Sequence, residues 1–312
     1  MKKMLLITVV LIIIPFFVVK ISNKDLKKYT ESEIKLDFVS NRIVRVKRVN
    51  KNRIDNVRLE EYVVGAVGGE MPVSFSIEAL KAQAVASRSY VLKKQENNKD
   101  GTYDVVDTTS NQVYLDDDDL KEKWKDSYVS YINKVREAVN ETSMEYLEYN
   151  GEIANTMFFS TSNGYTEDSQ VVFSEDIPYL KSVDSKWDES ISSSFNYEVE
   201  MSLDDFYKKL DLNYDKNLSI VLLDRSSSGR IISLKINGKL FTGREVYNKL
   251  KIRSTDFAVI QEGEKVKIKT KGFGHGVGMS QYGAFGMAKN GYKYNEILAH
   301  YYKGTNLKKL AN

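Results

Sequence analysis

The chain has 312 residues, of which 42% are hydrophobic, so it can bury a core, and wholesale disorder is excluded. Lysine and arginine total 46 against 43 acidic residues, and the net charge of +3 is too small to predict a nucleic-acid partner. Cysteine is absent, which excludes disulfides, thiolate metal sites and cysteine nucleophiles and leaves only His275 and His300 as imidazoles.

The N-terminus carries an uncharged apolar run over residues 4–19, directly after Lys2 and Lys3. As a helix this run would rise about 24 Å, close to the lower limit for crossing a bilayer. A secretory signal peptide is the alternative, but residues 16–20 offer no cleavage site with small side chains. The sequence therefore favours a transmembrane signal anchor over residues 1–21, with the N-terminus cytoplasmic and the remaining chain outside the membrane. A polar tether follows over residues 22–37.

The remaining chain mixes helix and strand patterns. Apolar residues recur at helical spacing over residues 59–67, and Gly68 and Gly69 are expected to end that helix. The acidic run 116–119 lacks the ligand order of an EF-hand calcium loop and predicts a solvated turn. The other expected elements are strands at 43–49, 231–236 and 265–270, helices at 77–93, 124–139 and 203–210, and a hairpin over 145–153. Because these elements follow no regular strand–helix–strand order, the sequence predicts an α+β fold.

Glu70 is the first candidate for catalysis. It follows two glycines, precedes Met71 and Pro72, and lies between two predicted helices. A carboxyl group among apolar neighbours loses hydration and is held back from ionising, which suits a general acid at neutral pH. The alternative is an ordinary surface glutamate in a loop.

The helix predicted over residues 77–93 carries Lys81 and Arg88. The two cations are seven residues apart, so they share one helix face. This placement favours a cleft that holds polar ligand groups. Ion pairing with Glu78 or another acid is the structural alternative.

A glycine-rich loop and a hydroxyl-rich turn complete the candidate sites. Six of the 18 glycines fall within residues 271–286, so backbone geometry is specified there, and no Walker A ending is present. His275 lies in this loop and is expected to make hydrogen bonds from it. In the turn over residues 158–167, Ser160 or Ser162 would need a neighbouring base to act as a nucleophile.

Four segments, taken in this order, resemble the stage II sporulation protein D family, which includes the amidase enhancers of bacterial cell walls. These segments are residues 59–72, 78–86, 160–164 and 274–284. The resemblance extends from about residue 40 to residue 306. It implies a mixed helix/strand extracytoplasmic catalytic region with a substrate groove over residues 38–310, in which core motifs at 57–183 and 230–306 flank a variable segment at 184–229.

The resemblance implies a lytic transglycosylase that cleaves peptidoglycan glycan strands to 1,6-anhydro ends during engulfment of the forespore. Glu70 takes the position of the family's catalytic acid, and Lys81 and Arg88 take its cationic helix positions. Tyr179, His275 and Gln281 are, with the two cations, the expected substrate contacts. A lytic transglycosylase needs one carboxylate because the muramic acid C6 hydroxyl is an internal nucleophile, whereas ordinary glycosidases need two.

The resemblance also implies partners and a departure from the family pattern. Expected partners are denuded glycan strands, the membrane, a cell-wall amidase and a membrane tether, the last two being stage II sporulation proteins P and M. Some relatives hold zinc with histidine and cysteine around residues 160–164. Phe159 stands where a histidine would be expected and cysteine is absent, so neither a metal nor another cofactor is expected.

Two other functions stay open at this point. A non-enzymatic glycan-binding activator of a cell-wall amidase would keep the groove and tolerate loss of Glu70. A conventional hydrolase would require a second essential acid, such as Glu167 or Asp168.

Overall fold

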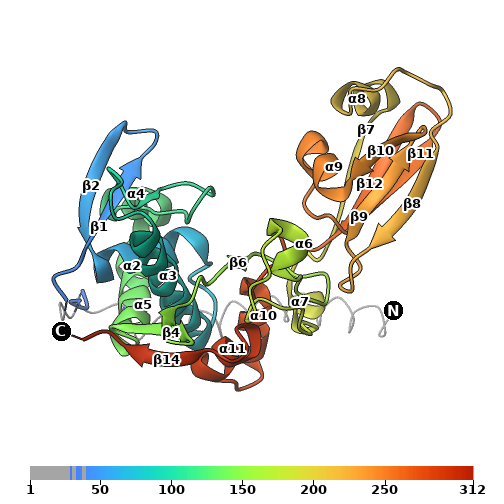
Figure 1. The fold of residues 1–312 in the computed structure, drawn as a ribbon. Helices are drawn as coiled ribbons and strands as arrows, with labels where there is room; N and C mark the ends of the chain where they lie inside the picture. The colour runs from blue at the N-terminus through green and yellow to red at the C-terminus, as the bar shows by residue number, and fades with distance from the viewer. Residues whose placement is uncertain (1–28, 30–32, 37–39, 312) are drawn as a thin grey trace, which may run out of the picture. The chain divides into compact units, whose positions relative to one another are not determined.

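The computed structural model describes residues 29, 33–36 and 40–311, and it mixes helices with short strands throughout (Figure 1). The chain divides into two compact units. The first runs to Glu145 and also includes the chain from Lys309 onward, and the second comprises Tyr146–Lys308.

The first unit combines a small sheet with a group of helices. Its strands are β1 (Ile43–Arg48), β2 (Arg53–Arg58) and β3 (Val105–Val106). β1 is the central strand, antiparallel to β2 and parallel to β3. The helices are α2 (Leu59–Glu70), α3 (Ile77–Asn97), α4 (Asp117–Trp124), the 3₁₀ turn η1 (Lys125–Ser127) and α5 (Tyr128–Glu141). α3 packs against both α2 and α5, and its side chains are buried in an almost unbroken run from Ala79 to Leu92.

The glycines of α2 do not end the helix, contrary to the sequence prediction. The helix continues through Gly68 and Gly69 to Glu70. A Cβ on Gly69 would lie 2.4 Å from the Val113 carbonyl oxygen, so this glycine lets the segment before α4 approach the helix closely. The helix ends instead at Met71, whose extended backbone (φ −118°, ψ 138°) is the conformation required before Pro72.

The acidic run 116–119 begins a helix, and the prediction of a solvated turn was wrong. Asp116 is the N-cap of α4 and forms a capping box with Asp119. Both carboxylates also accept hydrogen bonds from the buried guanidinium of Arg48. One Arg48 Nη donates to Asp116 Oδ2 at 2.7 Å, and the other donates to Asp119 Oδ2. The run therefore starts α4 and compensates a buried charge.

The second unit contains most of the strands. They are β4 (Glu145–Tyr149, which begins at the boundary), β5 (Glu152–Ile153), β6 (Phe158–Phe159), β7 (Asn196–Ser202), β8 (Ile220–Arg225), β9 (Ile231–Ile236), β10 (Lys239–Thr242), β11 (Phe257–Glu262), β12 (Lys265–Lys271), β13 (Met279–Ser280) and β14 (Asn306–Lys309). The helices are α6 (Ser169–Phe173), α7 (Trp187–Ile191), α8 (Leu203–Lys209), α9 (Gly243–Leu250), α10 (Gln281–Lys289) and α11 (Tyr294–Tyr301). The strands form small sheets, in the orders β14–β4–β5, β13–β6, β10–β9–β8 and β11–β12–β7.

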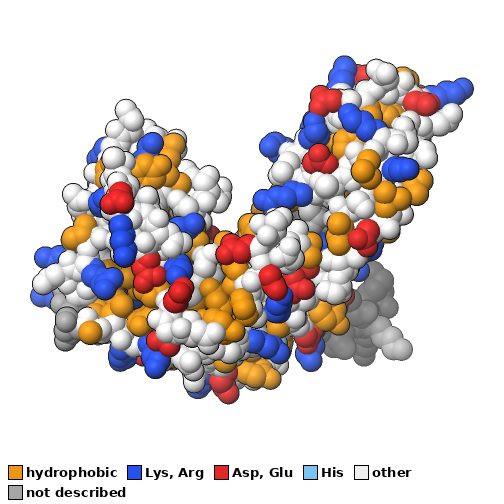
Figure 2. All heavy atoms as spheres, viewed as in Figure 1, with side chains coloured by type: hydrophobic (Ala, Val, Ile, Leu, Met, Phe, Trp, Pro, Cys, Tyr) orange, Lys and Arg blue, Asp and Glu red, His pale blue; other side chains and the backbone are white. Residues whose placement is uncertain are grey.

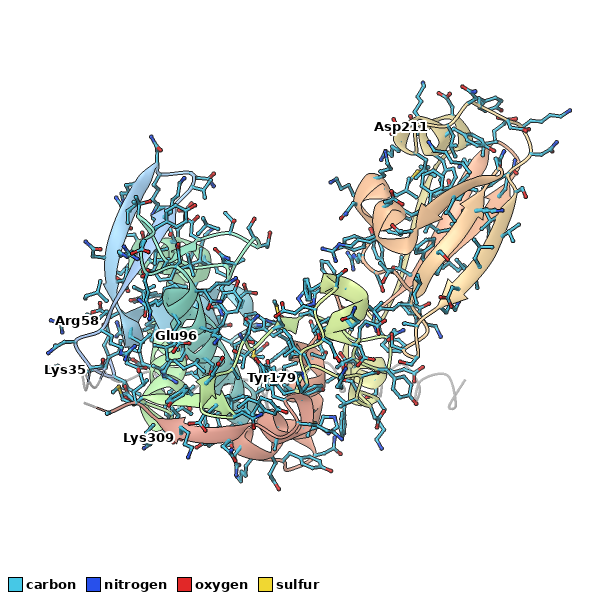
Figure 3. All side chains as sticks on the ribbon, viewed as in Figure 1. Lys35, Arg58, Glu96, Tyr179, Asp211 and Lys309 are labelled. Carbon is cyan, nitrogen blue, oxygen red and sulfur yellow. The ribbon has the colours of Figure 1, made fainter. Side chains whose placement is uncertain are left out.

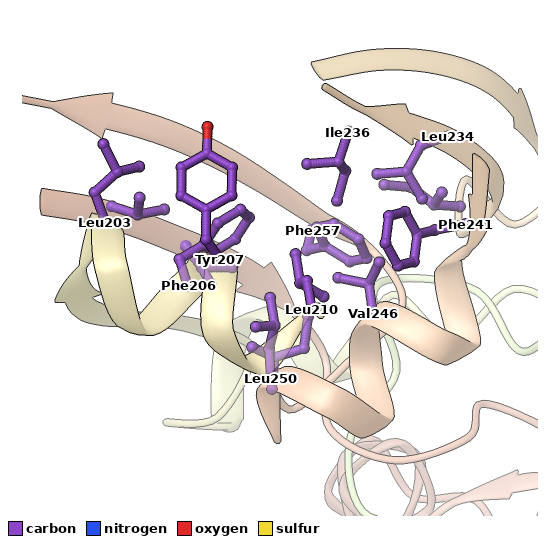
Figure 4. Packing of buried hydrophobic residues seen from close by; sticks show 14 residues of the cluster. Leu203, Phe206, Tyr207, Leu210, Leu234, Ile236, Phe241, Val246, Leu250 and Phe257 are labelled. Carbon is purple, nitrogen blue, oxygen red and sulfur yellow. The ribbon is translucent and has the colours of Figure 1, made fainter. Parts of the chain in front are cut away.

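Two of these sheets, β10–β9–β8 and β11–β12–β7, are antiparallel throughout. They share one hydrophobic core with α8 and α9 (Figure 4). Phe206 and Tyr207 of α8 and Val246 and Leu250 of α9 are buried against side chains of the strands. Figure 2 shows basic and acidic side chains interspersed on the face of each unit that it displays. Neither unit presents a basic stripe on that face.

The expected transmembrane helix is not part of the fold that the structure describes, so this element of the predicted fold class was wrong. No helix within residues 29, 33–36 and 40–311 is both long and apolar enough to cross a membrane. α3 has 21 residues, but it carries charged side chains such as Lys81 and Arg88, which are costly in hydrocarbon. Residues 4–19, on which the prediction was based, lie outside the described residues.

Candidate functional site

Glu70 is the last residue of α2, and it is half-buried. Its Oε1 accepts a hydrogen bond from the Val113 backbone amide at 2.6 Å. This bond is possible because Gly69 allows the Val113 backbone to lie against the helix. Glu70 therefore belongs to α2 by its backbone, and a hydrogen bond holds its carboxylate to the segment before α4.

The segment that binds Glu70 is itself held by side-chain hydrogen bonds. The Tyr62 hydroxyl donates to Gln112 Oε1 at 3.1 Å, and the Tyr62 ring stacks on Tyr114 with centroids 5.2 Å apart. Asn111 Nδ2 donates to the Tyr90 hydroxyl at 3.1 Å. These contacts fix the position of the Val113 amide, and through it the rotamer of Glu70.

Three ionisable groups interact electrostatically with Glu70. Burial raises the pKa of Tyr62 and of Tyr90, and the charge of Glu70 raises both further, so both hydroxyls stay protonated at neutral pH. Lys123 is exposed as a residue, yet burial around its ammonium lowers the pKa of Lys123, an effect that Glu70 opposes. Sequence reasoning missed all three, because nothing in the spacing of residues 62, 90 and 123 links them to residue 70.

Lys81 is largely covered and makes two ion pairs. Its Nζ lies 3.0 Å from Glu78 Oε1, and it also contacts the carboxylate of Glu141 on α5. The ion pair with Glu78 is the structural alternative raised by the sequence. The pair with Glu141 links α3 to α5.

Arg88 is fully buried, whereas the sequence favoured a place for it in a cleft that holds polar ligand groups. Its Nε donates to Glu60 Oε1 at 2.9 Å, one Nη donates to Glu60 Oε2 at 2.5 Å, and the other donates to the Glu145 carbonyl at 2.9 Å. Glu60 is 3% exposed and also accepts from the Met144 amide at 3.3 Å. Arg88 therefore connects α3, α2 and the end of the first unit inside its core. Lys81 and Arg88 do not share an environment, although they lie on one helix.

In the second unit the hydroxyl-rich turn and the glycine-rich loop lie side by side. β13 pairs in parallel with β6, and an antiparallel bridge joins Thr161 to Phe273. The glycines permit this approach: a Cβ on Gly278 would lie 2.0 Å from the Met157 carbonyl oxygen, and its φ is +79°. The glycine-rich loop is thus shaped to pack on another segment of backbone.

His275 is held in a neutral form within this loop. The Val277 amide donates to Nδ1 at 3.0 Å, which leaves the ring proton on Nε2. The ring lies 5.7 Å from the Phe159 ring and 5.6 Å from the Phe173 ring. Burial of the ring lowers the pKa of His275 to about 4, a hydrogen bond with the Phe158 backbone opposes this, and the charges of Arg244 and Arg230 assist it.

This shift predicts a pH dependence of stability. The unfolded chain binds a proton at His275 below about pH 6.5, whereas the folded chain resists protonation down to about 4. The contribution of His275 to the free energy of unfolding is therefore fully present above about pH 6.5 and is lost as the pH falls toward 4. When the pH is lowered from about 7 to about 5, we expect the unfolding temperature of His275→Gln to fall less than that of the parent. The matched control is His300→Gln, and an identical fall in His275→Gln and the parent would contradict the prediction.

Asp188 is a functional candidate that the sequence did not reveal, since it lies in the predicted variable segment 184–229. It is fully buried and accepts from the Ser162 amide at 2.9 Å, Ser280 Oγ at 2.5 Å and Ser185 Oγ at 2.8 Å. Burial raises the pKa of Asp188, and these hydrogen bonds oppose the rise. Asp188 therefore joins the hydroxyl-rich turn to the start of α10. Ser162 is committed to this network by its amide and by its own Oγ, which donates to the Ser185 carbonyl at 3.1 Å.

The two other expected substrate contacts are buried in the second unit. The Tyr179 hydroxyl accepts from the Asn155 amide at 2.8 Å, and its ring lies 5.0 Å from the Tyr149 ring (Tyr179 is labelled in Figure 3). Gln281 is the first residue of α10 and is 6% exposed. Tyr179, His275 and Gln281 thus belong to one unit, whereas Glu70, Lys81 and Arg88 belong to the other.

Comparison with known proteins identifies the family. A family model described as "Stage II sporulation protein" matches residues 47–149, and one described as a domain of unknown function (DUF8618) matches residues 118–278. Stage II sporulation protein D of Bacillus subtilis (strain 168) is 38% identical over 270 residues, which cover 85% of this chain and 78% of the relative. The chain belongs to the stage II sporulation protein D family. This membership confirms the resemblance and gives the chain a role in sporulation.

Two more relatives fit the same assignment. Stage II sporulation protein D of Bacillus amyloliquefaciens is 39% identical over 270 residues, with 85% of this chain and 78% of the relative covered. The amidase enhancer of Bacillus subtilis (strain 168) is 30% identical over 297 residues, which cover 78% of this chain and 40% of that protein. The sporulation protein match at 47–149 contains Glu70, Lys81 and Arg88.

The hydroxyl-rich turn of this family member remains a predicted metal-free site. Phe159 is 5% exposed and packs its ring against His275. Within the described part of the chain, no group of three or more histidine and acidic side chains is arranged to hold a metal ion. The Ser162 amide and the Ser280 hydroxyl donate to the Asp188 carboxylate, and the Ser162 hydroxyl donates to the Ser185 carbonyl.

We therefore expect a chelator to leave the unfolding temperature unchanged. A structural zinc site contributes folding free energy directly, so its removal would lower the unfolding temperature conspicuously. The measurement is thermal unfolding with and without chelator, together with elemental analysis of untagged protein. Stoichiometric zinc would overturn the prediction.

Proposed function

We propose that this protein is a peptidoglycan lytic transglycosylase in which Glu70 is the catalytic acid and base. Glu70 supports the proposal by its position: a half-buried carboxylate held at the end of α2 by the Val113 amide, with Tyr62, Tyr90 and Lys123 as its electrostatic neighbours. It lies in the segment that matches the sporulation protein family.

The proposed reaction needs one carboxyl group. Protonated Glu70 gives its proton to the glycosidic oxygen, and the bond from that oxygen to C1 of muramic acid breaks. The resulting carboxylate then takes the proton of the C6 hydroxyl while that oxygen bonds to C1 and closes the 1,6-anhydro ring. Attack within one sugar benefits from a high effective molarity, so no water has to be positioned.

The contacts of Glu167 and Asp168 disfavour a conventional hydrolase. Glu167 is fully buried, and its Oε2 accepts from Ser228 Oγ at 2.7 Å and also from Ser226 Oγ. Asp168 Oδ1 accepts from the Ser182 amide at 2.7 Å. Each acid thus holds backbone or neighbouring hydroxyls in place, which is a structural use of a carboxylate.

The proposed setting is the cell wall outside the cytoplasmic membrane, during engulfment of the forespore. The relative named amidase enhancer supports a link to a cell-wall amidase. We propose denuded glycan strands as the substrate, because an amidase removes the stem peptides first, and an amidase and a membrane tether as partners. The same relative's name favours the second candidate, a non-enzymatic activator of an amidase.

The mass of the products separates these functions. Purified glycan strands without stem peptides are incubated with the full chain, and the released fragments are analysed by mass spectrometry. A lytic transglycosylase gives ends that are one water lighter than the reducing ends of a hydrolase. Reducing ends would reject the proposal in favour of hydrolysis, and uncut strands with a stimulated amidase would favour the activator.

A further inference from the structure

Lys123 of α4 lies against the last turn of α2. Its Nζ donates to the Gly68 carbonyl at 2.8 Å and is 3.4 Å from the Gly69 carbonyl oxygen. These carbonyls belong to the residues directly before Glu70 and are among the last of the helix, which have no partner within it. Lys123 therefore caps the end of α2 that carries the proposed catalytic residue.

The charge of Lys123 also acts on Glu70. The carboxyl end of a helix carries a partial negative charge, so a carboxylate there is repelled by the helix itself. Lys123 opposes this repulsion, and its electrostatic interaction with Glu70 is favourable. Other groups that interact with Glu70 include the Val113 amide, which donates to it, and Tyr62 and Tyr90, whose hydroxyls stay neutral because burial raises their pKa.

The reaction proposed above needs such a cation at one moment. Once the glycosidic oxygen has taken the proton, Glu70 is a carboxylate until the C6 hydroxyl gives a proton back. During that interval the negative charge lies at the negative end of α2. A cation fixed by two carbonyls of the same turn stabilises that charge and keeps the last turn in register with the Val113 amide.

We propose that Lys123 is a positioning residue for Glu70, which holds the last turn of α2 and stabilises the carboxylate that forms between the two proton transfers. This inference rests on the proposed function of Glu70. Lys123 itself exchanges no proton with the substrate.

Three substitutions separate its two contributions. Lys123→Met removes both the hydrogen bonds and the charge, Lys123→Gln keeps a hydrogen-bond donor but removes the charge, and Lys123→Arg keeps the charge. The matched control is Lys121→Met, because Lys121 is an exposed lysine of the same helix whose ion pair is with Asp117 at 2.6 Å. Thermal unfolding of each variant shows that it is folded.

The experiment measures release of anhydro fragments from peptide-free glycan strands by the full chain across a range of pH. In Lys123→Met we expect kcat to fall about tenfold at the optimum with KM changed less than about twofold. Loss of a neighbouring positive charge makes an acid harder to ionise, so the alkaline limb of the pH–rate profile moves up by about one pH unit. Lys123→Gln moves the limb equally, whereas Lys123→Arg and Lys121→Met leave it in place.

The position of the limb is the deciding readout, because it does not depend on the fraction of folded enzyme. A limb in Lys123→Met that coincides with the parent's overturns the inference, even if kcat is lower, since a purely structural cap would have that effect. Glu70→Gln is measured in parallel. If it still releases anhydro fragments, the proposed catalytic role of Glu70 fails; if it is inactive and the limb is unmoved, only the role of Lys123 fails.

Discussion

Replacement of Glu70 with glutamine is expected to abolish glycan cleavage while leaving the fold and strand binding nearly intact. Glutamine has almost the same shape, and its side-chain carbonyl oxygen can still accept the hydrogen bond that Val113 donates to Oε1. It has no acidic proton to deliver, however, and general acid–base catalysis contributes about 10² to 10⁴ in rate. We expect a loss of at least this size, measured as anhydro fragments released from peptide-free strands.

Two further variants make this test specific. Glu61→Gln removes an exposed carboxylate from the same helix and is expected to leave the rate unchanged. Glu70→Asp keeps the acid but withdraws it by one methylene from the position that the Val113 amide defines, and misplacement of about 1 Å costs on the order of 10² in rate. Cleavage by Glu70→Gln near the parental rate would remove Glu70 from the mechanism.

The elements that the sequence predicted correctly are those set by local rules. The hairpin over 145–153 turns at Asn150 and Gly151, and both residues adopt the positive φ (50° and 86°) that such a turn requires. The strands at 231–236 and 265–270 follow from alternation of apolar and polar side chains, and β9 and β12 begin at the expected residues. The alternation of apolar and polar side chains and the choice of turn residues are sufficient to predict such elements, because neighbouring residues in the sequence determine their conformation.

The predictions that failed depend on contacts between distant segments. Gly68 and Gly69 have the signature of a helix end, but they serve close packing, Gly68 against Leu120 and Trp124 of α4 and Gly69 against Val113. The helix predicted over 124–139 begins later, as α5 at Tyr128, because Trp124 ends a separate helix capped by Asp116 and Lys125 has a positive φ of 46°. Neither cause can be read from the apolar period alone.

The candidate site shows the same division. Glu70 was chosen as a candidate from its neighbours in sequence, and the structure adds the amide that holds it. Lys123 and Asp188 had no sequence signal, because each acts on residues that are far away in the chain. Arg88 is buried instead of lining the expected cleft, because α3 packs against both α2 and α5 and is buried on most sides.

Replacement of Arg88 with alanine is expected to destabilise the first unit strongly, and this is the second large effect that the structure predicts. The substitution leaves Glu60 buried at 3% exposure without its bidentate partner. Breaking a buried ion pair by removing one partner costs about 3–5 kcal/mol, because the remaining charge is uncompensated. At about 2–4 °C per kcal/mol for a unit of this size, the unfolding temperature should fall by roughly 10 °C.

Lys81→Ala is the matched control, since Lys81 lies on the same helix and pairs with Glu78 and Glu141 nearer the surface. We expect it to cost only about 1 kcal/mol or less. A double variant, Glu60→Met with Arg88→Met, should recover most of the stability, because well-packed apolar side chains replace a buried pair with little loss. Arg88→Lys should not recover it, since a lysine cannot reproduce the two parallel hydrogen bonds to Glu60.

The same variants decide whether Arg88 also meets the glycan. Its three hydrogen-bond acceptors are the two carboxylate oxygens of Glu60 and the Glu145 carbonyl oxygen, all inside the first unit, so a folded double variant should bind peptide-free strands as the parent does. If Arg88→Ala instead unfolds at the parental temperature and loses strand binding, the arginine acts on the substrate and its ion pair contributes little. If both stability and binding fall in Arg88→Ala and only stability returns in the double variant, the guanidinium has a role in each.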